Sequence, residues 1–149
     1  MLLDRESDMT IRGSCLCGQI EYEIERQDYV VDHCHCTFCQ KATGAGFGSY
    51  ANVESKYFRW VSGEDRVAHF QSSSHSGRLF CPNCGSLIAA DIEDGKVFGV
   101  TLGTLDEDIT IETGCHIFIR SKATWCEIKD DWPQYDAYPP GFDHLTPTD

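Results

Sequence analysis

The sequence predicts an all-β protein, an antiparallel sandwich or barrel assembled from many short strands. Apolar Ile20, Tyr22 and Ile24 alternate with charged or polar neighbours, which is the pattern of a strand with one buried face. Gly, Ser, Asn and Asp interrupt the chain at short intervals, and only residues 38–42 suggest a helical turn. Many short strands separated by turn signals favour two packed antiparallel sheets or a barrel.

The remaining strands follow in order along the chain. We predict them at residues 30–36, 47–51, 57–61, 67–71, 79–80, 86–90, 97–102, 109–111 and 114–119. Gly63, the Asp94-Gly95 pair and residues 106–108 are predicted turns. Residues 130–142 contain prolines that exclude a central strand and large aromatic side chains that favour packing. We expect this segment to be an irregular strap that covers an apolar sheet face, rather than a lid over a ligand.

Length and charge exclude several classes of protein. A chain of 149 residues is expected to form one domain that buries about two thirds of its unfolded surface. The net charge of −12 disfavours binding to nucleic acid or to anionic lipid. No apolar run approaches the roughly 20 residues of a membrane-spanning helix, and charged residues stand where a secretion signal would be apolar. We therefore expect a cytoplasmic protein that binds neither nucleic acid nor membrane.

An anionic small ligand would need a local basic patch on so acidic a protein. The candidates are Lys41, Arg78, Arg120 and Lys122. Ordinary solvated surface charge is the simpler interpretation of each.

Nine cysteines are an excess for this length, and they point to metal ligation. Their odd number and the reducing environment of the cytosol disfavour a disulfide framework. Seven of them fall in three clusters, Cys15-Leu16-Cys17-Gly18, Cys34-His35-Cys36-Thr37-Phe38-Cys39 and Cys81-Pro82-Asn83-Cys84-Gly85. The other two, Cys115 and Cys126, are expected to be small buried apolar residues.

The first and third clusters together offer a closed metal site. A pair of thiolates two residues apart grips one ion through a tight turn, and a structural zinc ion needs four ligands in a tetrahedron. Cys15, Cys17, Cys81 and Cys84 supply those four and would tie the start of the chain to its middle. Structural zinc contributes on the order of 10 kcal/mol to small domains, so this site is expected to stabilise the fold.

The middle cluster has three cysteines and no obvious fourth ligand. On a strand over residues 30–36, Cys34 and Cys36 would share a face, while His33 and His35 would point to the opposite face. Cys39 would fold back from the following turn. Three protein ligands with a vacant position are typical of catalytic zinc. The alternatives are a closed site completed by Cys115, Cys126 or His116, or an iron–sulfur centre.

Five segments of the chain form a specific pattern: residues 13–18, 33–39 and 80–85, the run Leu102-Gly103-Thr104-Leu105-Asp106, and the stretch from His116-Ile117-Phe118-Ile119 to Trp125. This pattern resembles the glutathione-dependent formaldehyde-activating enzyme (GFA) family, which also includes centromere protein V. The resemblance runs from about Gly13 to Pro140, and seven cysteines in the same order are its most specific part.

The resemblance implies an Mss4-like (β-tent) fold, an antiparallel β-sandwich with two Zn²⁺ per chain. It implies structural zinc on Cys15, Cys17, Cys81 and Cys84, and catalytic zinc on Cys34, Cys36 and Cys39 with an open fourth position. It also implies a carbon–sulfur lyase that adds a thiol, glutathione or similar, to formaldehyde or another small aldehyde. On this basis we expect an N-terminal extension (1–12), a single GFA-type zinc-binding domain (13–142) that includes the strap, and a tail (143–149).

Two other functions are consistent with the sequence. The first is a non-catalytic zinc-binding Mss4-like module for a protein partner, which would need no open metal position. The second is a redox enzyme similar to a methionine sulfoxide reductase, which would need Cys115 or Cys126 as a free reactive thiol.

Overall fold

The computed structural model describes residues 9–141, and its strands form two β-sheets. The small sheet has the strand order β1-β2-β5, and the large one has the order β10-β3-β4-β9-β8-β7-β6. All strand pairs are antiparallel except β10 with β3, which run parallel. The predicted fold class, an all-β antiparallel sandwich of short strands, is therefore confirmed.

The bounds of the elements follow the predicted strands closely in most places. The strands are β1 Thr10–Ser14, β2 Glu21–Glu25, β3 Val30–Cys34, β4 Gly48–Glu54, β5 Phe58–Ser62, β6 Ala68–Gln71, β7 Ser76–Phe80, β8 Leu87–Ile92, β9 Val97–Thr101 and β10 Thr113–Ile117. The helix α2 spans Thr37–Thr43, and four 3-10 turns occupy Ser55–Tyr57, Glu64–Arg66, Leu102–Thr104 and Ile119–Ser121.

Two segments differ from the sequence prediction. The strand β1 was not predicted, yet it pairs along its whole length with β2, from Thr10 opposite Glu25 to Ser14 opposite Glu21. The strand predicted at 109–111 is wrong, because that segment forms no ladder. Ile109 and Ile111 instead pack against the core as the chain crosses toward β10. Residues 1–8 and 142–149 hold most of the expected extension and the tail, and they lie outside the described residues.

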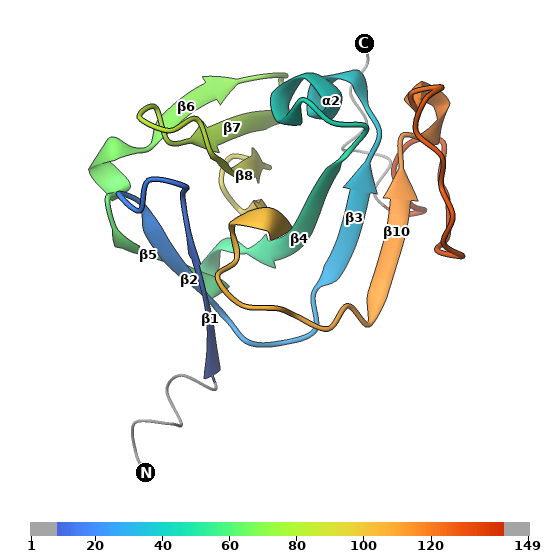
Figure 1. Ribbon diagram of the computed structural model, residues 1–149. Coiled ribbons are helices and arrows are strands. Elements are labelled where there is room, and N and C mark those ends of the chain that lie inside the picture. The colour runs from blue at the N-terminus through green and yellow to red at the C-terminus, as the bar shows by residue number, and fades with distance from the viewer. Residues whose placement is uncertain (1–8, 142–149) are drawn as a thin grey trace.

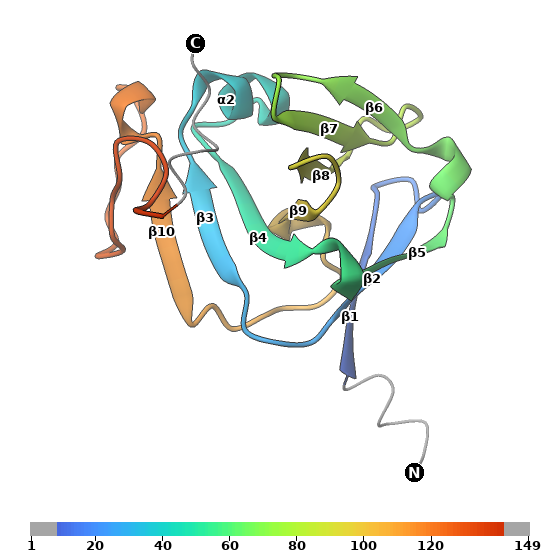
Figure 2. The same cartoon turned by 180° about the vertical axis from the view of Figure 1, so that it is seen from behind.

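The large sheet is strongly curved, and the small sheet is set against one side of it (Figures 1 and 2). Successive side chains of a strand point to opposite faces of the sheet, so one set of the large sheet's side chains faces the small sheet and the other set faces away from it. Val31, Ala51, Val53, Ala89 and Val100 belong to the main core, together with Ile11, Ile20, Tyr22 and Ile24 of the first two strands and the turn between them. Their neighbours Asp32, Tyr50 and Ala90 face the other way and line a cavity.

The main core explains why the small sheet folds onto the large one. Ile20, Tyr22 and Ile24 are almost completely buried, as the predicted alternation requires. Fully burying a side chain of this kind contributes about 1.5 to 3 kcal/mol. The hydroxyl of Tyr22 remains satisfied inside the core because it lies 2.6 Å from Thr104 Oγ1.

The strap predicted at 130–142 follows the edge of the large sheet as far as the structure describes it. Gln134 bridges His116 of β10, and Tyr135 N–H donates to the His116 carbonyl at 2.9 Å. Tyr135 and Tyr138 pack on the buried residues around Cys34 and Cys115. The strap therefore pairs with the edge strand β10 and packs on the sheet, and Tyr138 also forms one wall of the cavity.

Candidate metal centres

The four cysteines of the first and third clusters lie in two loops of similar shape. Cys15 follows β1, and its N–H donates to the Ile20 carbonyl; Cys81 follows β7, and its N–H donates to the Ser86 carbonyl. Each loop turns at a glycine with a positive φ of 79°, Gly18 in one and Gly85 in the other. Only glycine adopts this conformation without strain, so both turns depend on it.

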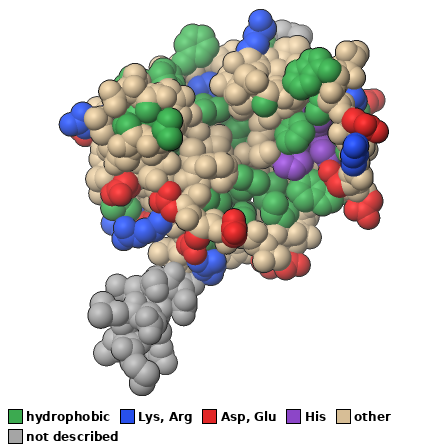
Figure 3. Space-filling model, viewed as in Figure 1, with side chains coloured by type: hydrophobic (Ala, Val, Ile, Leu, Met, Phe, Trp, Pro, Cys, Tyr) green, Lys and Arg blue, Asp and Glu red, His purple; other side chains and the backbone are tan. Residues whose placement is uncertain are grey.

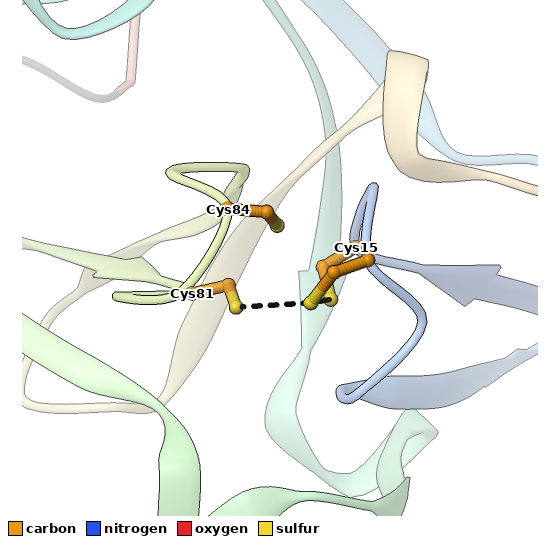
Figure 4. Close-up of side chains that lie close together, drawn as sticks. Cys15, Cys81 and Cys84 are labelled. Carbon is orange, nitrogen blue, oxygen red and sulfur yellow. Dashed lines mark hydrogen bonds between the residues drawn. The ribbon is translucent and has the colours of Figure 1, made fainter.

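The two loops face each other and bring all four sulfurs together. The four Sγ atoms lie within 4.8 Å of one another, and Figure 4 shows Cys15, Cys81 and Cys84 turned toward a common point. Cys17 Sγ lies 3.6 Å from Cys15 Sγ and 3.8 Å from Cys81 Sγ. Zinc–sulfur bonds of about 2.3 Å in a tetrahedron place sulfurs about 3.8 Å apart. No disulfide competes, because all nine cysteines are free.

Hydrogen bonds hold these four cysteines in place. Ile20 N–H lies 3.3 Å from Cys15 Sγ, and the Ser86 hydroxyl lies 3.3 Å from Cys84 Sγ. Ser86 also accepts from Leu16 N–H at 2.9 Å, so it joins the two loops directly. The hydrogen bond from Ser86 lowers the pKa of Cys84 to about 5. A thiolate at this position suits a metal ligand.

The three cysteines of the middle cluster converge through a helix start. Cys34 is the last residue of β3, Cys36 is the N-cap of α2, and Cys39 lies in the first turn of that helix. The strand thus ends earlier than predicted, because Cys36 Sγ caps the helix by accepting from Cys39 N–H at 3.3 Å. The three Sγ atoms lie within 4.8 Å of one another. It is this capped turn, and not strand alternation, that brings Cys36 to the other two.

The sulfurs of this cluster interact strongly with one another. Hydrogen bonds from Cys34 and Cys39, together with the Cys39 N–H, lower the pKa of Cys36 to about 3, although burial opposes this. Hydrogen bonds with Cys36 and Cys39, together with burial, raise the pKa of Cys34. The lowered pKa of Cys36 favours its thiolate form, to which a divalent cation would be attracted.

A cavity of about 600 Å³ opens beside these three cysteines. Its floor is the face of the large sheet that looks away from the main core, and Phe38, Phe118 and Tyr138 contribute apolar walls. A space of this size holds a small organic molecule. The four-cysteine cluster does not line this cavity.

Arg78 was considered from the sequence as a solvated surface charge, and that interpretation is wrong. Its side chain enters the cavity wall from β7 and is only 8% exposed. Its Nη1 and Nη2 lie 3.7 and 3.6 Å from Cys39 Sγ, and Nη1 donates to the Tyr50 hydroxyl at 3.2 Å. The Tyr50 hydroxyl donates to the same sulfur at 3.4 Å. Although burial opposes the charge, Cys39 and Tyr50 raise the pKa of Arg78.

The other basic candidates lie elsewhere. Arg120 is exposed and lines the cavity, with its guanidinium 5.4 Å from the centre of the Phe118 ring. Lys122 donates to the carbonyls of Ala123 and Cys126, and Lys41 is exposed. No basic patch of these four residues forms at the cavity, because only Arg78 and Arg120 reach it.

Asp32 is a cavity residue that the sequence analysis did not single out. It precedes Cys34 by two positions on β3, so the two side chains share a face. Asn52 Nδ2 donates to its carboxylate at 2.7 Å. Burial raises the pKa of Asp32 to about 7, although the hydrogen bond from Asn52 opposes this. The alternation that places Cys34 could have identified Asp32.

The histidines lie on the opposite face, as predicted. His33 Nδ1 and Ser49 Oγ are 2.8 Å apart, and the His33 ring stacks on Trp132. His35 Nε2 is 2.8 Å from His116 Nδ1, and His116 Nε2 is 2.9 Å from Asp130. Figure 3 shows histidine and hydrophobic side chains gathered over β3 and β10.

None of the alternative ligands joins the three-cysteine group. Within residues 9–141, the groups of metal-ligating side chains contain neither His116 nor Cys115 nor Cys126. Cys115 is buried and lines the cavity, and burial raises its pKa to about 11. Cys126 is partly buried. Both groups of cysteines therefore fit a metal ion, one with four ligands and one with three.

In the described part of the chain, no helix is long and apolar enough to span a membrane.

Comparison with known proteins identifies relatives in sequence and in fold. The chain is 29% identical over 84 residues to an uncharacterized lyase of Schizosaccharomyces pombe, a match that covers 56% of this chain and 59% of that protein. The fold is similar to the crystal structure of a Rhodobacter sphaeroides protein, with a TM-score of 0.58 and 22% identity over 69% of this chain and 97% of the other.

A family model matches most of the chain. The model of the glutathione-dependent formaldehyde-activating enzyme covers residues 10–121, which include all seven motif cysteines and Arg78. The match begins at β1 and ends beyond β10, so it spans both sheets. The chain belongs to the glutathione-dependent formaldehyde-activating enzyme family.

Proposed function

We propose that this chain is a zinc-dependent carbon–sulfur lyase-type enzyme that adds a thiol to formaldehyde or another small aldehyde and gives an S-hydroxymethyl thiol or its analogue. The observation that carries the proposal is the position of the three-cysteine cluster in the wall of a cavity of about 600 Å³. Family membership and the lyase-named relative support the reaction class. We place the activity in a single cytoplasmic domain over residues 13–142.

The reaction itself balances without an oxidant or a reductant. A sulfur–hydrogen bond and the carbonyl π bond break, and a carbon–sulfur bond and an oxygen–hydrogen bond form. The difficulty lies in the thiol, because a free thiol with a pKa near 8.5 is only a few per cent ionised at neutral pH. A useful site must therefore favour the thiolate and hold the aldehyde beside it.

The residues of the cavity fit that task. Cys34, Cys36 and Cys39 would hold Zn²⁺, which when bound supplies an open coordination position and favours the ionised form of an entering thiol. Tyr50 and Arg78 hold Cys39 through hydrogen bonds to its sulfur. The apolar walls at Phe118 and Tyr138 limit access of water to the reacting groups.

Glutathione is one candidate thiol, but the cavity does not single it out. Asp32, Glu54 and Glu93 lie around the cavity, while Arg78 is already committed to Cys39. Among the residues that line the cavity, Arg120 is then the one remaining arginine or lysine. An anionic tripeptide such as glutathione has two carboxylates to pair with it. Other thiols should therefore be compared with glutathione.

Exchange spectroscopy by NMR tests the proposal. The wild-type protein, present far below the substrate concentration, is expected to accelerate exchange among formaldehyde, glutathione and S-(hydroxymethyl)glutathione above the rate in buffer. Cys36→Ser is expected to lose this acceleration. Cys126→Ser is the matched control, because it removes one thiol outside both clusters.

The choice of thiol decides how much of the proposal stands. Acceleration with another thiol alone would keep the reaction class and discard glutathione. No acceleration with any thiol or small aldehyde, from protein that holds two zinc ions, would favour a non-catalytic module.

A further inference from the structure

Arg78 is a buried cation whose hydrogen-bond partners include a cysteine sulfur and no carboxylate. Both terminal nitrogens of its guanidinium lie within 3.7 Å of Cys39 Sγ. The ion pairs found among residues 9–141 do not include Arg78. Its Nε is buried without an acceptor. Apart from the sulfur cluster, its one hydrogen-bond partner is the neutral hydroxyl of Tyr50.

A guanidinium in this position needs a negative partner. Burying an unpaired charge is strongly unfavourable, and buried charges in proteins are paired or coordinate a metal. Three neutral thiols at Cys34, Cys36 and Cys39 would leave Arg78 without an anionic partner. Thiolates in this cluster supply the missing charge, and a thiolate is also the form in which cysteine binds a metal ion. The burial of Arg78 is thus a separate reason to regard this cluster as anionic.

The charge balance of the whole site then follows. Three thiolates around a divalent cation leave one net negative charge, and the guanidinium of Arg78 cancels it. An anionic ligand entering the vacant position would bring the assembly to one negative charge. Without Arg78 the same ligand would bring it to two, inside a cavity wall where charge is poorly solvated. A neutral ligand does not change the charge in either case.

The four-cysteine cluster provides a contrast within the same chain. Its sulfurs have hydrogen-bond contacts with the Ile20 N–H, with Ser86 and with one another, and among the described residues no arginine or lysine donates to them. Cys17 is exposed, so water can stabilise the negative charge there. A compensating arginine is therefore a property of the cluster beside the cavity.

We propose that Arg78 is the positioning residue that sets the net charge of the three-cysteine metal site, so that this site takes an anionic sulfur ligand in preference to a neutral one. Hydrogen bonds to a ligating sulfur also reduce the charge that it donates to the metal, which keeps the ion a stronger Lewis acid. The inference rests on the proposed function only in requiring a divalent cation on Cys34, Cys36 and Cys39.

Cobalt-loaded protein tests this proposal without an activity assay. Co²⁺ in place of Zn²⁺ gives thiolate charge-transfer and d–d absorption bands that report ligands at the site. The wild type is titrated at one fixed pH with 2-mercaptoethanol, which binds as an anion, and with imidazole, which binds as a neutral molecule. For Arg78→Met we expect thiol affinity to fall by about tenfold or more and imidazole affinity to change by less than about twofold. Arg78→Lys should lie between the two.

Arg120→Met is the matched control, because Arg120 lines the same cavity but stacks near Phe118 and makes no contact with sulfur. It should bind both probes as the wild type does. Equal weakening of the binding of both probes in Arg78→Met, or unchanged thiol binding, would overturn the proposal and would show that Arg78 only packs in the cavity wall.

The number of cobalt ions bound gives a second result. If Arg78→Met does not hold a second cobalt ion, retention of that ion by Arg78→Lys supports the charge argument, and loss of the ion in both variants overturns it. A wild type that binds only one cobalt ion would remove the proposed function and this inference together. Two cobalt ions with unchanged probe affinities would remove the inference alone.

Discussion

The two cysteine clusters use the same ligand atom in different surroundings. The first cluster consists of Cys15, Cys17, Cys81 and Cys84, which lie in two loops that each end in a glycine. The Sγ atom of Cys17 lies 3.6 Å from that of Cys15 and 3.8 Å from that of Cys81. Cys34, Cys36 and Cys39 lie at a strand end and a helix start, beside a cavity and a buried arginine. The first group has the four ligands that close a tetrahedron, and the second has three.

This difference teaches how one kind of side chain can serve two roles. The loops of the first cluster join the small sheet to the large one, so a metal ion there would link segments more than 60 residues apart. The second cluster lies within a segment of six residues, where a metal ion closes almost no loop of the chain. We therefore expect the first site to matter mainly for stability and the second mainly for chemistry.

The largest expected effect is the loss of a ligand at the four-cysteine site. Cys84→Ser should unfold or aggregate the protein, because structural zinc contributes on the order of 10 kcal/mol to small domains. Cys36→Ser should lose one metal ion and keep most of the β signal. Circular dichroism together with metal analysis checks both variants, and the wild type should hold close to two zinc ions. If both variants unfold alike, the contrast between the sites is wrong.

Metal removal should separate the sites next. A chelator added in steps is expected to take the ion at Cys34, Cys36 and Cys39 first, because that site has three protein ligands and opens to a cavity. The β signal should persist until the second ion leaves. Zinc release, followed with a chromogenic chelator alongside circular dichroism, measures the two steps. Simultaneous release of both ions, with immediate loss of structure, would contradict this order.

The sequence predicted the cysteine grouping because each cluster is local. Thiols two or three residues apart meet through one turn, and Gly18 and Gly85 mark two of those turns. Most strands were also predicted, because their alternation reflects a single buried face. The strand β1 was missed since Thr10–Ser14 contains one large apolar residue, Ile11, and its pairing with β2 is what makes it a strand.

Features that depend on contacts between distant segments could not be predicted from the local pattern of residues. Arg78 looks like an ordinary surface charge in its own segment, and its burial depends on Cys39 and Tyr50 from other elements. The parallel pairing of β10 with β3 joins residues more than 80 positions apart. The capping of α2 by Cys36 also required the structure, because the periodicity of residues 30–36 favoured a longer strand.

Two buried tyrosines offer a smaller test of the comparison. Tyr50 donates to Cys39 Sγ and accepts from Arg78, while Tyr22 pairs with Thr104 in the main core. Tyr50→Phe and Tyr22→Phe should each cost about 1 kcal/mol of stability. Only Tyr50→Phe should shift the cobalt charge-transfer bands of the three-cysteine site. Chemical denaturation and absorption spectra measure the two effects, and a spectral shift in Tyr22→Phe would contradict the assignment.

The smallest expected effect concerns a brace behind the three-cysteine cluster. His116 Nε2 lies 2.9 Å from Asp130 and His116 Nδ1 lies 2.8 Å from His35 Nε2, so the three side chains form a chain of hydrogen bonds. His35 stands between Cys34 and Cys36, so this chain of hydrogen bonds supports the cluster from the opposite face. Among the described residues, no histidine or carboxylate braces the four-cysteine site in this way.

The hydrogen bond from His116 lowers the pKa of Asp130, which fixes the sign of its pH dependence. A carboxyl group whose pKa is lowered on folding stabilises the protein at pH values above its ordinary pKa, and this contribution is lost as the pH falls through the lowered value. Asp130→Asn should therefore unfold more easily than the wild type at pH 7. The difference should shrink as the pH falls below about 4, the ordinary pKa of the group, and should disappear below its lowered pKa. The effect should be smaller than that of either tyrosine, because Asp130 is exposed to solvent. Asp131→Asn controls for the change of net charge, since Asp131 is an exposed neighbour outside the brace. Thermal unfolding of the three proteins from pH 3 to pH 8 measures the difference, and identical curves for the two variants would show that the brace contributes nothing.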